Sequence, residues 1–328
     1  MTLLLGQVVL GLALLIVGAE VMVRGASHLA RSIGISSFVV GLTVVAFGTS
    51  APELGVSLRD AYVAEGELAV GNIIGSNIAN IGLILGVTAL ICPIAVKLGV
   101  VRREAMIMIV VTFAGMLAML GGGIHRVAGG LLVLGLLVFT LRAYRAGRDA
   151  SGEEQSELVK AAKELDEELH LQGTPPWWTS VLRVVAGLAM LYFGSDFLVG
   201  GSRGIAENLG VSEAVIGLTM VAFGTSVPEL ALSSVAAFRK QPDIAIGNIL
   251  GSNIFNILCV LGIASLLAPD PLLVPPELWR RDIWVMLLFA LLCIPVMTSQ
   301  ARITRLEGGL LLGLYLVYMG VIYWMNRG

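Results

Sequence analysis

Long apolar stretches separated by short polar segments run along almost the whole chain. Ten of these stretches are long enough to cross the apolar core of a bilayer, which needs about 20 residues in a helix. They cover residues 3–30, 35–60, 67–91, 104–121, 127–144, 180–207, 212–238, 243–268, 281–298 and 304–325. The pattern predicts an all-α polytopic membrane protein with ten transmembrane helices. The first stretch lacks a basic start and is too long for a signal peptide, so we expect a retained membrane helix.

A polar segment, residues 145–176, separates the fifth stretch from the sixth. Its charged residues are mostly acidic, and Leu158, Ala161 and Leu165 recur at helical spacing, which predicts one short amphipathic helix. The segment is too short for a separate calcium-sensing domain, so a solvated connector is favoured over a regulatory segment. The chain then divides into residues 1–144, the linker 145–176, and residues 177–328.

The two halves carry the same sequence. Residues 38–90 align without gaps to residues 214–266 at a constant offset of 176, with 28 of 53 pairs identical. GLTVVAFGTSAPEL in the first half corresponds to GLTMVAFGTSVPEL in the second, and GNIIGSNIANI corresponds to GNILGSNIFNI. The same offset pairs Glu20 with Asp196, so the repeat spans five helices. Because five is odd, the second copy is expected to enter the membrane upside down, as in transporters built from inverted repeats.

Composition agrees with a lipid environment. Hydrophobic residues make up 57% of the chain, charged residues only 13%, and the mean hydropathy is +0.90. A soluble domain has about 25% charged residues. The chain has no basic tract, so a nucleic-acid partner is not expected. Its three cysteines and three histidines are scattered, which predicts neither disulfides nor a resident metal or other cofactor.

Lysine and arginine positions predict the orientation. With the N-terminus outside, 15 of these residues fall on the inner side and 6 on the outer side. Cytoplasmic loops carry the excess of positive charge. We therefore expect both termini outside and the central linker in the cytoplasm.

Each half places one carboxylate in the middle of a predicted membrane helix, Glu53 in the first and Glu229 in the second. An ionised group at that depth has to be paired, hydrated or bound to an ion. No lysine or arginine lies at a comparable depth in these segments, since Arg59 and Arg239 are near helix ends. The expected partner is a cation from outside the protein.

The residues around Glu53 favour a broken helix with exposed oxygen atoms. Thr49 lies one turn before Glu53 on the same helix face. Pro52 has no N–H and crowds the carbonyl of Gly48, which interrupts helical bonding and frees carbonyls near Ala46. Such backbone is tolerated in a membrane where it is buried or lines a cavity. The second half repeats the pattern with Ala222, Gly224, Thr225, Ser226, Pro228 and Glu229.

The third and eighth helices add polar faces. Ser76 and Asn80 are four residues apart, as are Ser252 and Asn256, so each pair shares one face. All these candidate ligands are oxygens, which hard cations such as calcium prefer, in sets of six to eight. Two carboxylates neutralise one divalent ion or hold two or more monovalent ions. Competition between different cations for the same two carboxylates is the property that an antiporter needs.

The repeated motifs GTSAPEL and GTSVPEL, each followed by GSN, resemble the two alpha repeats of the calcium:cation antiporter superfamily, most closely its prokaryotic sodium/calcium exchanger branch. The resemblance covers nearly the whole chain. It implies a protein of the prokaryotic cytoplasmic membrane that exchanges sodium for calcium by alternating access and is not an enzyme. One chain is expected to be sufficient for transport, and the oligomeric state stays open. It also implies that the first and sixth helices slide past the others.

The resemblance further implies which residues bind the transported ions. The two glutamates would be the main ligands, joined by the hydroxyls of the GTS and GSN motifs, two alanine carbonyls, and the last asparagine of each GSNxxN motif. The implied ligands are Glu53, Glu229, Thr49, Ser50, Thr225, Ser226, Ala46, Ala222, Ser76, Ser252, Asn80 and Asn256.

One departure is Asn256, where some members carry aspartate. The change removes one candidate charge and leaves the sodium count and any potassium dependence open.

Three other functions remain as alternatives. In a calcium/proton or other cation/proton exchanger, the same glutamates would carry protons, and calcium flux would be independent of sodium. A cation channel would show ohmic conductance, but channels build ion-binding rings from several subunits. An intramembrane enzyme would need a metal motif or a nucleophile–base pair, and neither accompanies the two carboxylates.

Overall fold

The computed structural model describes residues 1–63, 66–149, 176–209, 224–298 and 301–325. The predicted amphipathic helix of the linker and the first part of the seventh predicted span lie outside the described residues. In the first half, the helices are α1 (Thr2–Ile33), α2 (Ser37–Val40), η1 (Gly41–Val45), α3 (Ala46–Thr49), α4 (Ala51–Val63), α5 (Glu67–Ala79), η2 (Asn80–Leu85), α6 (Gly86–Ile91), α7 (Leu98–Ala118) and α8 (Arg126–Asp149). In the second half, they are α10 (Trp177–Asn208), α12 (Val227–Phe238), α13 (Pro242–Phe255), η3 (Asn256–Leu261), α14 (Gly262–Leu267), η4 (Leu278–Asp282), α15 (Ile283–Thr298) and α16 (Arg305–Met325).

These helices occupy the predicted apolar stretches. Within the described residues, seven helices are long and apolar enough to cross a membrane, and the bent pair Ser37–Thr49 with Ala51–Tyr62 would make an eighth. Helix α7 spans 21 residues but carries charges near its start, and α12 is a shorter apolar helix of 12 residues. The prediction of a helical polytopic membrane protein is therefore confirmed at this level.

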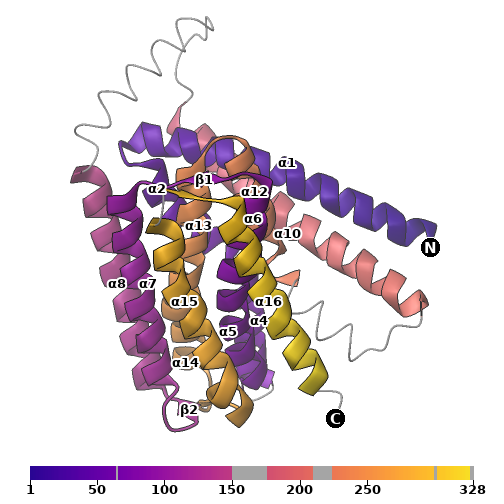
Figure 1. Cartoon of the computed structure of the whole chain (residues 1–328), viewed down its shortest axis with the longest axis vertical. Helices are drawn as coiled ribbons and strands as arrows, with labels where there is room; N and C mark the ends of the chain where they lie inside the picture. The colour runs from indigo at the N-terminus through magenta and orange to yellow at the C-terminus, as the bar shows by residue number, and fades with distance from the viewer. Residues whose placement is uncertain (64–65, 150–175, 210–223, 299–300, 326–328) are drawn as a thin grey trace, which may run out of the picture.

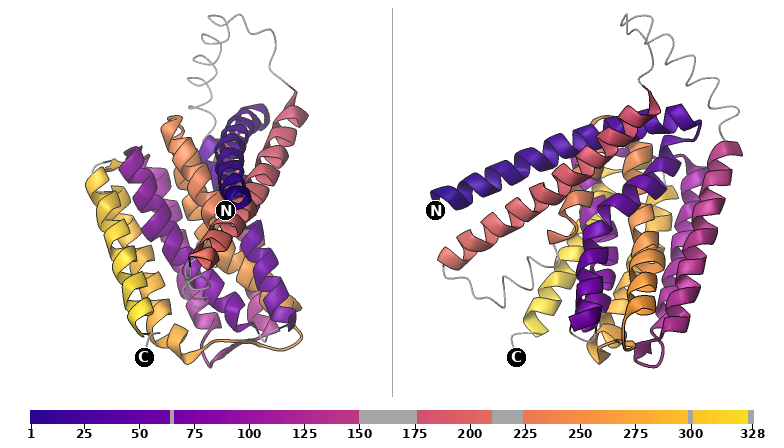
Figure 2. Two further views of the ribbon diagram at one scale, coloured as in Figure 1. Left: turned by 90° about the vertical axis from the view of Figure 1, so that its right-hand side faces the viewer. Right: turned by 180° about the vertical axis from the view of Figure 1, so that it is seen from behind.

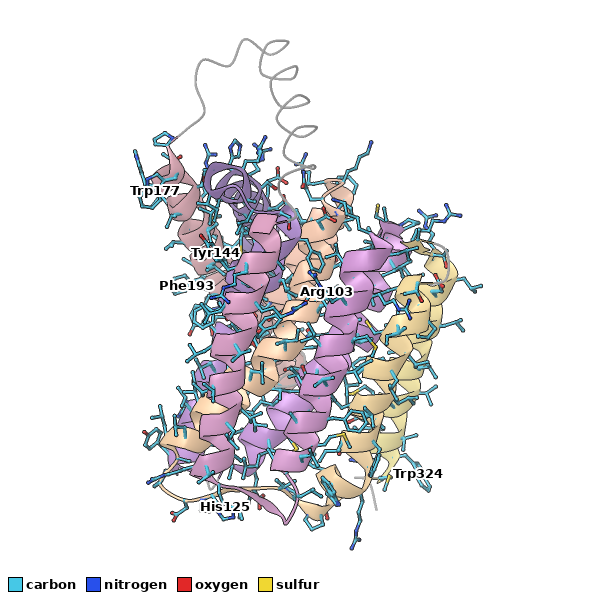
Figure 3. The ribbon with its side chains drawn as sticks, turned by 90° about the vertical axis from the view of Figure 1, so that its left-hand side faces the viewer. Arg103, His125, Tyr144, Trp177, Phe193 and Trp324 are labelled. Carbon is cyan, nitrogen blue, oxygen red and sulfur yellow. The ribbon has the colours of Figure 1, made fainter. Side chains whose placement is uncertain are left out.

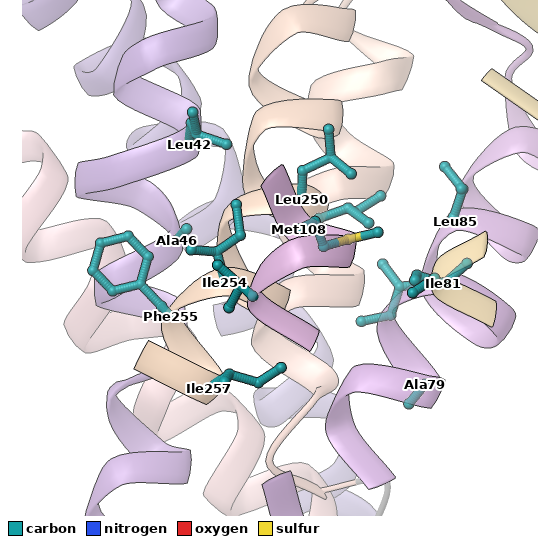
Figure 4. Packing of buried hydrophobic residues seen from close by; sticks show 14 of the residues in the cluster. Leu42, Ala46, Ala79, Ile81, Leu85, Met108, Leu250, Ile254, Phe255 and Ile257 are labelled. Carbon is teal, nitrogen blue, oxygen red and sulfur yellow. The ribbon is translucent and has the colours of Figure 1, made fainter. Parts of the chain in front are cut away.

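The helices that carry the repeated GSN motifs form the centre of the bundle (Figure 1). In the most apolar stretch of Glu67–Ile91, 78% of the residues are buried, and in that of Pro242–Leu267, 89%. Helix α13 is buried from Ile244 to Phe255. It packs against the chain around Leu42 and Ala46 on one side and Met108 of α7 on another, as Figure 4 shows. Most side chains on α5 and α13 are therefore shielded from lipid.

Helices α1 and α10 run side by side and obliquely to the rest of the bundle (Figures 1 and 2). Glycines let their backbones approach closely, because a Cβ on Gly18 would lie 2.7 Å from the Cβ of Met190 and one on Gly187 would lie 2.7 Å from the Cβ of Met22. The two helices therefore form an interlocked pair.

Glu20 connects α1 to the end of α12. Its carboxylate accepts a hydrogen bond from the Nε of Arg24, four residues later in the same helix, at 2.6 Å. It also accepts one from the Nε of Arg239, again at 2.6 Å. Glu20 thus anchors a helix.

Two short strand pairs join the first half to the second. Strand β1 (Ile94–Ala95) pairs antiparallel with β4 (Arg302–Ile303), and β2 (Gly123–Ile124) pairs with β3 (Leu272–Leu273). Under the 176-residue offset, β1 falls within three residues of β3, and β2 within three residues of β4. The β1 and β2 labels lie at opposite ends of the bundle in Figure 1. Equivalent segments of the two sequence repeats are therefore found at opposite ends.

Candidate functional site

Each buried glutamate lies in the first turn of a helix that begins inside the bundle. Helix α3 ends at Thr49, Ser50 leaves the helical conformation with ψ of 5°, and α4 starts at Ala51 after a bend of 42°. In the second half, Ser226 has ψ of 0° and α12 starts at Val227. A proline at the second position of each helix needs no hydrogen-bond acceptor there. The N–H groups of the helix ends favour negative charge at these positions.

The last asparagine of each GSNxxN motif starts a π-helical segment. Segment η2 begins at Asn80 and η3 begins at Asn256. Each interrupts a central helix at the same place in the repeat. Such segments occur frequently at functional sites, because they reorient side chains and loosen backbone hydrogen bonding. Sequence patterns did not predict them.

Two equivalent hydrogen-bonded chains link the halves. The hydroxyl of Thr49 donates to Oδ1 of Asn248 at 3.0 Å, and Nδ2 of Asn248 donates to Oγ of Ser233 at 3.1 Å. The counterpart runs from Thr225 to Asn72 at 3.5 Å and from Asn72 to Ser57 at 3.3 Å.

Each chain therefore joins the broken helix of one half to the GSN helix of the other. The asparagines orient the threonine hydroxyls.

The two carboxylates lie close together at the meeting point of these chains. Glu53 and Glu229 are each 1% exposed. Thr225 lies beside the carboxylate of Glu53 and Thr49 beside that of Glu229, and the two carboxylates are near enough to repel each other. None of the ion pairs in the described part of the chain involves either glutamate. Two like charges in a dry interior are costly unless a cation lies between them.

Several buried oxygens at this place have no hydrogen-bond partner among the described residues. Nine buried polar atoms in the described chain lack a partner, and seven belong to residues that the sequence singled out. These seven, called the oxygen cluster below, are Ser50 Oγ, Glu53 Oε2, Ser76 Oγ, Asn80 Oδ1, Ser226 Oγ, Glu229 Oε2 and Asn256 Oδ1. Buried polar atoms are normally satisfied. Seven such oxygens, six of them in pairs related by the repeat, have the composition of a coordination shell for a hard cation.

The remaining predicted ligands are placed as follows. The Ala46 carbonyl accepts the N–H of Ser50 at 3.0 Å, so it is not free of hydrogen bonds as the sequence suggested. Ser252 is fully buried with its Oγ 3.5 Å from that of Thr49. Nδ2 of Asn256 donates to Oδ1 of Asn77 at 3.5 Å. Ala222 lies outside the described residues.

Sequence reasoning missed Ser57 and Ser233. Both are fully buried, and they accept the hydrogen bonds that orient Asn72 and Asn248. The signal was available, because each serine lies one helical turn after a glutamate and the two are identical at the repeat offset. Each serine therefore holds an asparagine that in turn accepts a hydrogen bond from a threonine of the other half.

Ser233→Ala tests this positioning role. It leaves Nδ2 of Asn248 without its acceptor, and an unsatisfied buried donor costs about 1–3 kcal/mol. We expect a lower melting temperature in detergent and about tenfold weaker calcium binding. The weaker binding would be measured as a smaller calcium-induced rise in the melting temperature. Ser265→Ala is the matched control, since Ser265 is also buried but donates to the carbonyl of Leu261, four residues earlier in the chain. Equal effects of the two variants on the calcium response would contradict the assignment.

Known proteins resemble this chain over nearly its whole length. The model of the family described as sodium/calcium exchanger protein matches residues 3–145 and 179–324. CaxA of Alkalimonas amylolytica is 39% identical over 319 residues, covering 96% of this chain and 97% of that protein. The sodium/calcium exchanger MaX1 of Methanosarcina acetivorans is 29% identical, covering 89% of this chain and 91% of MaX1.

A solved structure of the sodium-calcium exchanger NCX_Mj, soaked with sodium and calcium, superimposes with a TM-score of 0.81 at 30% identity. The match covers 97% of this chain and 98% of that one. Family model, relatives and fold agree over nearly the full length. The chain belongs to the sodium/calcium exchanger protein family, in the prokaryotic branch of the calcium:cation antiporters.

Proposed function

We propose that this protein is a secondary active antiporter that exchanges sodium for calcium across the membrane by alternating access. The observation that carries the proposal is the group of seven buried, unpartnered oxygens, two of which belong to carboxylates with no ion-pair partner in the described chain. The proposed ion ligands are the residues named from the resemblance, with Glu53 and Glu229 as the charged pair. Calcium and sodium are the substrates, and no resident cofactor is involved.

The charge of the site supports coupled exchange of ions and argues against a passive leak of one ion. Two ionised glutamates contribute a charge of −2, which one calcium ion or two sodium ions neutralise. With neither ion bound, two like charges remain in a low-dielectric interior, where their repulsion is strong. That repulsion disfavours the occluded conformation through which an empty carrier would have to pass. Ion movement in one direction is then coupled to ion movement in the other.

We propose that ten spans form the transporter, arranged as two inverted five-helix repeats. The exchange of strand partners between the halves supports this, as do the equivalent hydrogen-bonded chains that cross between them. The lysine and arginine distribution favours both termini outside and the linker in the cytoplasm, in a prokaryotic cytoplasmic membrane.

The interlocked pair α1 and α10 is the proposed moving part. It leaves the bundle obliquely and packs through glycines. Transporters of this plan alternate access by movement of one group of helices around a fixed site. One chain supplies both halves of that site, so a monomer suffices for transport.

Related proteins support the choice of ions. MaX1 is named a sodium/calcium exchanger, and the NCX_Mj structures were obtained after soaking with sodium, calcium or strontium. We propose the same ions for this chain, because its oxygen cluster has the composition of a hard-cation site.

The test is calcium uptake into sodium-loaded liposomes that contain the purified protein. Dilution into sodium-free buffer is expected to drive uptake, and dissipating the pH gradient with an ionophore is expected to leave it unchanged. Uptake that ignores sodium and follows a proton gradient would assign the protein to the proton-coupled exchangers instead. Calcium permeation without any counter-ion would identify a passive pathway.

A further inference from the structure

A groove of about 510 Å³ runs along the outside of the bundle between α7 and α8. Its lining includes three arginines, Arg102, Arg103 and Arg142, and then the apolar side chains of Met106 and Val110. Arg102, Met106 and Val110 are four residues apart and share one face of α7. Arg103 lies toward the end of the bundle that carries Tyr144 and Trp177, away from His125 (Figure 3). The groove is therefore cationic near one end of the bundle and apolar toward its middle.

A buried carboxylate holds two of the arginines in place. Glu104 is 2% exposed and forms a bidentate pair with Arg142, at 3.1 and 3.2 Å, from the facing helix. It also accepts from the Nε of Arg103 at 3.0 Å. One carboxylate neutralises only one of three guanidinium groups, so the groove keeps a net charge of about +2.

Arg102 is the one arginine of the three that does not pair with Glu104. In the part of the chain that the structure describes, it makes no hydrogen bond or ion pair, and it projects at the exposed rim of the groove. Guanidinium groups match phosphodiester oxygens with paired hydrogen bonds. A fixed pair of arginines beside a free one is an arrangement suited to a single phosphate-bearing group.

The apolar half of the groove points to a lipid as the source of that phosphate. Val110 is 63% exposed and Met106 is 49% exposed, so both present apolar surface on the outside of the bundle. From Arg102 to Val110 the helix rises about 12 Å, the scale of a headgroup and the upper part of an acyl chain. Basic pockets between membrane helices on the cytoplasmic side bind the headgroups of anionic lipids. A free phosphate ion would use only the cationic half.

We propose that this groove binds one anionic phospholipid, with its phosphodiester on Arg102 and Arg103 and an acyl chain along Met106 and Val110. The groove shares no residue with the oxygen cluster around Glu53 and Glu229, so the proposal does not depend on ion exchange. A bound lipid would join α7 to α8 and stabilise the folded protein.

The test measures the melting temperature of the detergent-purified protein with added phosphatidylglycerol, phosphatidylcholine or inorganic phosphate. Phosphatidylglycerol is expected to stabilise the protein, and the other two are not. Arg102→Gln is expected to weaken the affinity for phosphatidylglycerol about tenfold, because one charge-assisted hydrogen bond is lost. The stabilisation at a given lipid concentration should be correspondingly smaller. Its melting temperature without lipid should match the wild type, because Arg102 does not bind Glu104.

Arg305→Gln is the control, since Arg305 is an exposed arginine outside the groove and should leave the lipid response intact. Val110→Trp fills the apolar half without changing charge, and it should also suppress the response. Equal stabilisation by phosphatidylcholine or by inorganic phosphate would overturn the lipid assignment. An unchanged phosphatidylglycerol response in both Arg102→Gln and Val110→Trp would overturn the site.

Discussion

Glu53→Gln and Glu229→Gln are each expected to abolish sodium-driven calcium uptake while the protein stays folded. Glutamine keeps the shape of glutamate and removes only the charge. If a cation lies between the two carboxylates, removing one partner of a buried charged pair costs about 3–5 kcal/mol. That loss corresponds to a decrease of more than a hundredfold in calcium affinity.

The same substitutions are expected to raise the melting temperature of the ion-free protein. Without calcium or sodium, ionised carboxylates at these positions are costly, first because they are buried and second because they repel each other, and one glutamine removes part of that cost. Calcium should then no longer stabilise the variant. The measurement is the melting temperature in detergent with and without calcium, alongside uptake in liposomes.

Glu67→Gln is the matched control, because Glu67 is exposed at the start of α5 and should behave like the wild type in both assays. A Glu53→Gln variant that still shows calcium-dependent stabilisation of wild-type size would exclude Glu53 as an ion ligand. The test of the carboxylate pair is therefore separate from the test of which ion drives transport.

Gly251→Ala is expected to have the second-largest effect, and to act through packing. A Cβ on Gly251 would collide with the carbonyl oxygen of Leu42 and lie 2.6 Å from the Cβ of Ala46. Backbone cannot move aside as a flexible side chain can, so α13 would have to separate from the broken helix of the first half. Overpacking of this kind costs about 1–3 kcal/mol.

The separation would also displace Ser252, the next residue, whose Oγ is 3.5 Å from that of Thr49. We therefore expect both a lower melting temperature and weaker calcium binding. Gly313→Ala is the control, because Gly313 lies on α16 and a Cβ added there would have no atom within 4 Å. A Gly251→Ala protein as stable as this control would mean that the two helices do not approach so closely in the membrane.

Much of the architecture and the residues of the site were predictable from the sequence, because lipid and repetition both leave strong signals. An apolar run of sufficient length has few folds available in a bilayer. A carboxylate beside a proline, duplicated at a fixed offset, has few structural explanations. Glu53, Ser50, Ser76 and their counterparts in the other half could therefore be named as candidate ligands before any contact was known.

The details that remained hidden depend on contacts between distant residues. Whether Asn248 faced an ion or bridged two helices could not be decided until Ser233 and Thr49 were seen on either side of it. The π-helical turns at Asn80 and Asn256 arise from packing inside the bundle, and local sequence carries little trace of them. Glu104 and Arg142 are 38 residues apart, and the sequence of neither segment predicts that they form an ion pair.

The strand pairs have a consequence for how the protein is made. Strand β1 leaves the ribosome some 200 residues before its partner β4, and β2 about 150 residues before β3. Contacts between residues so distant in sequence form late in folding, because a long stretch of chain has to be ordered first. The first half therefore waits in the membrane with its strands unpaired, and the molecule is closed at both ends only when synthesis is nearly complete.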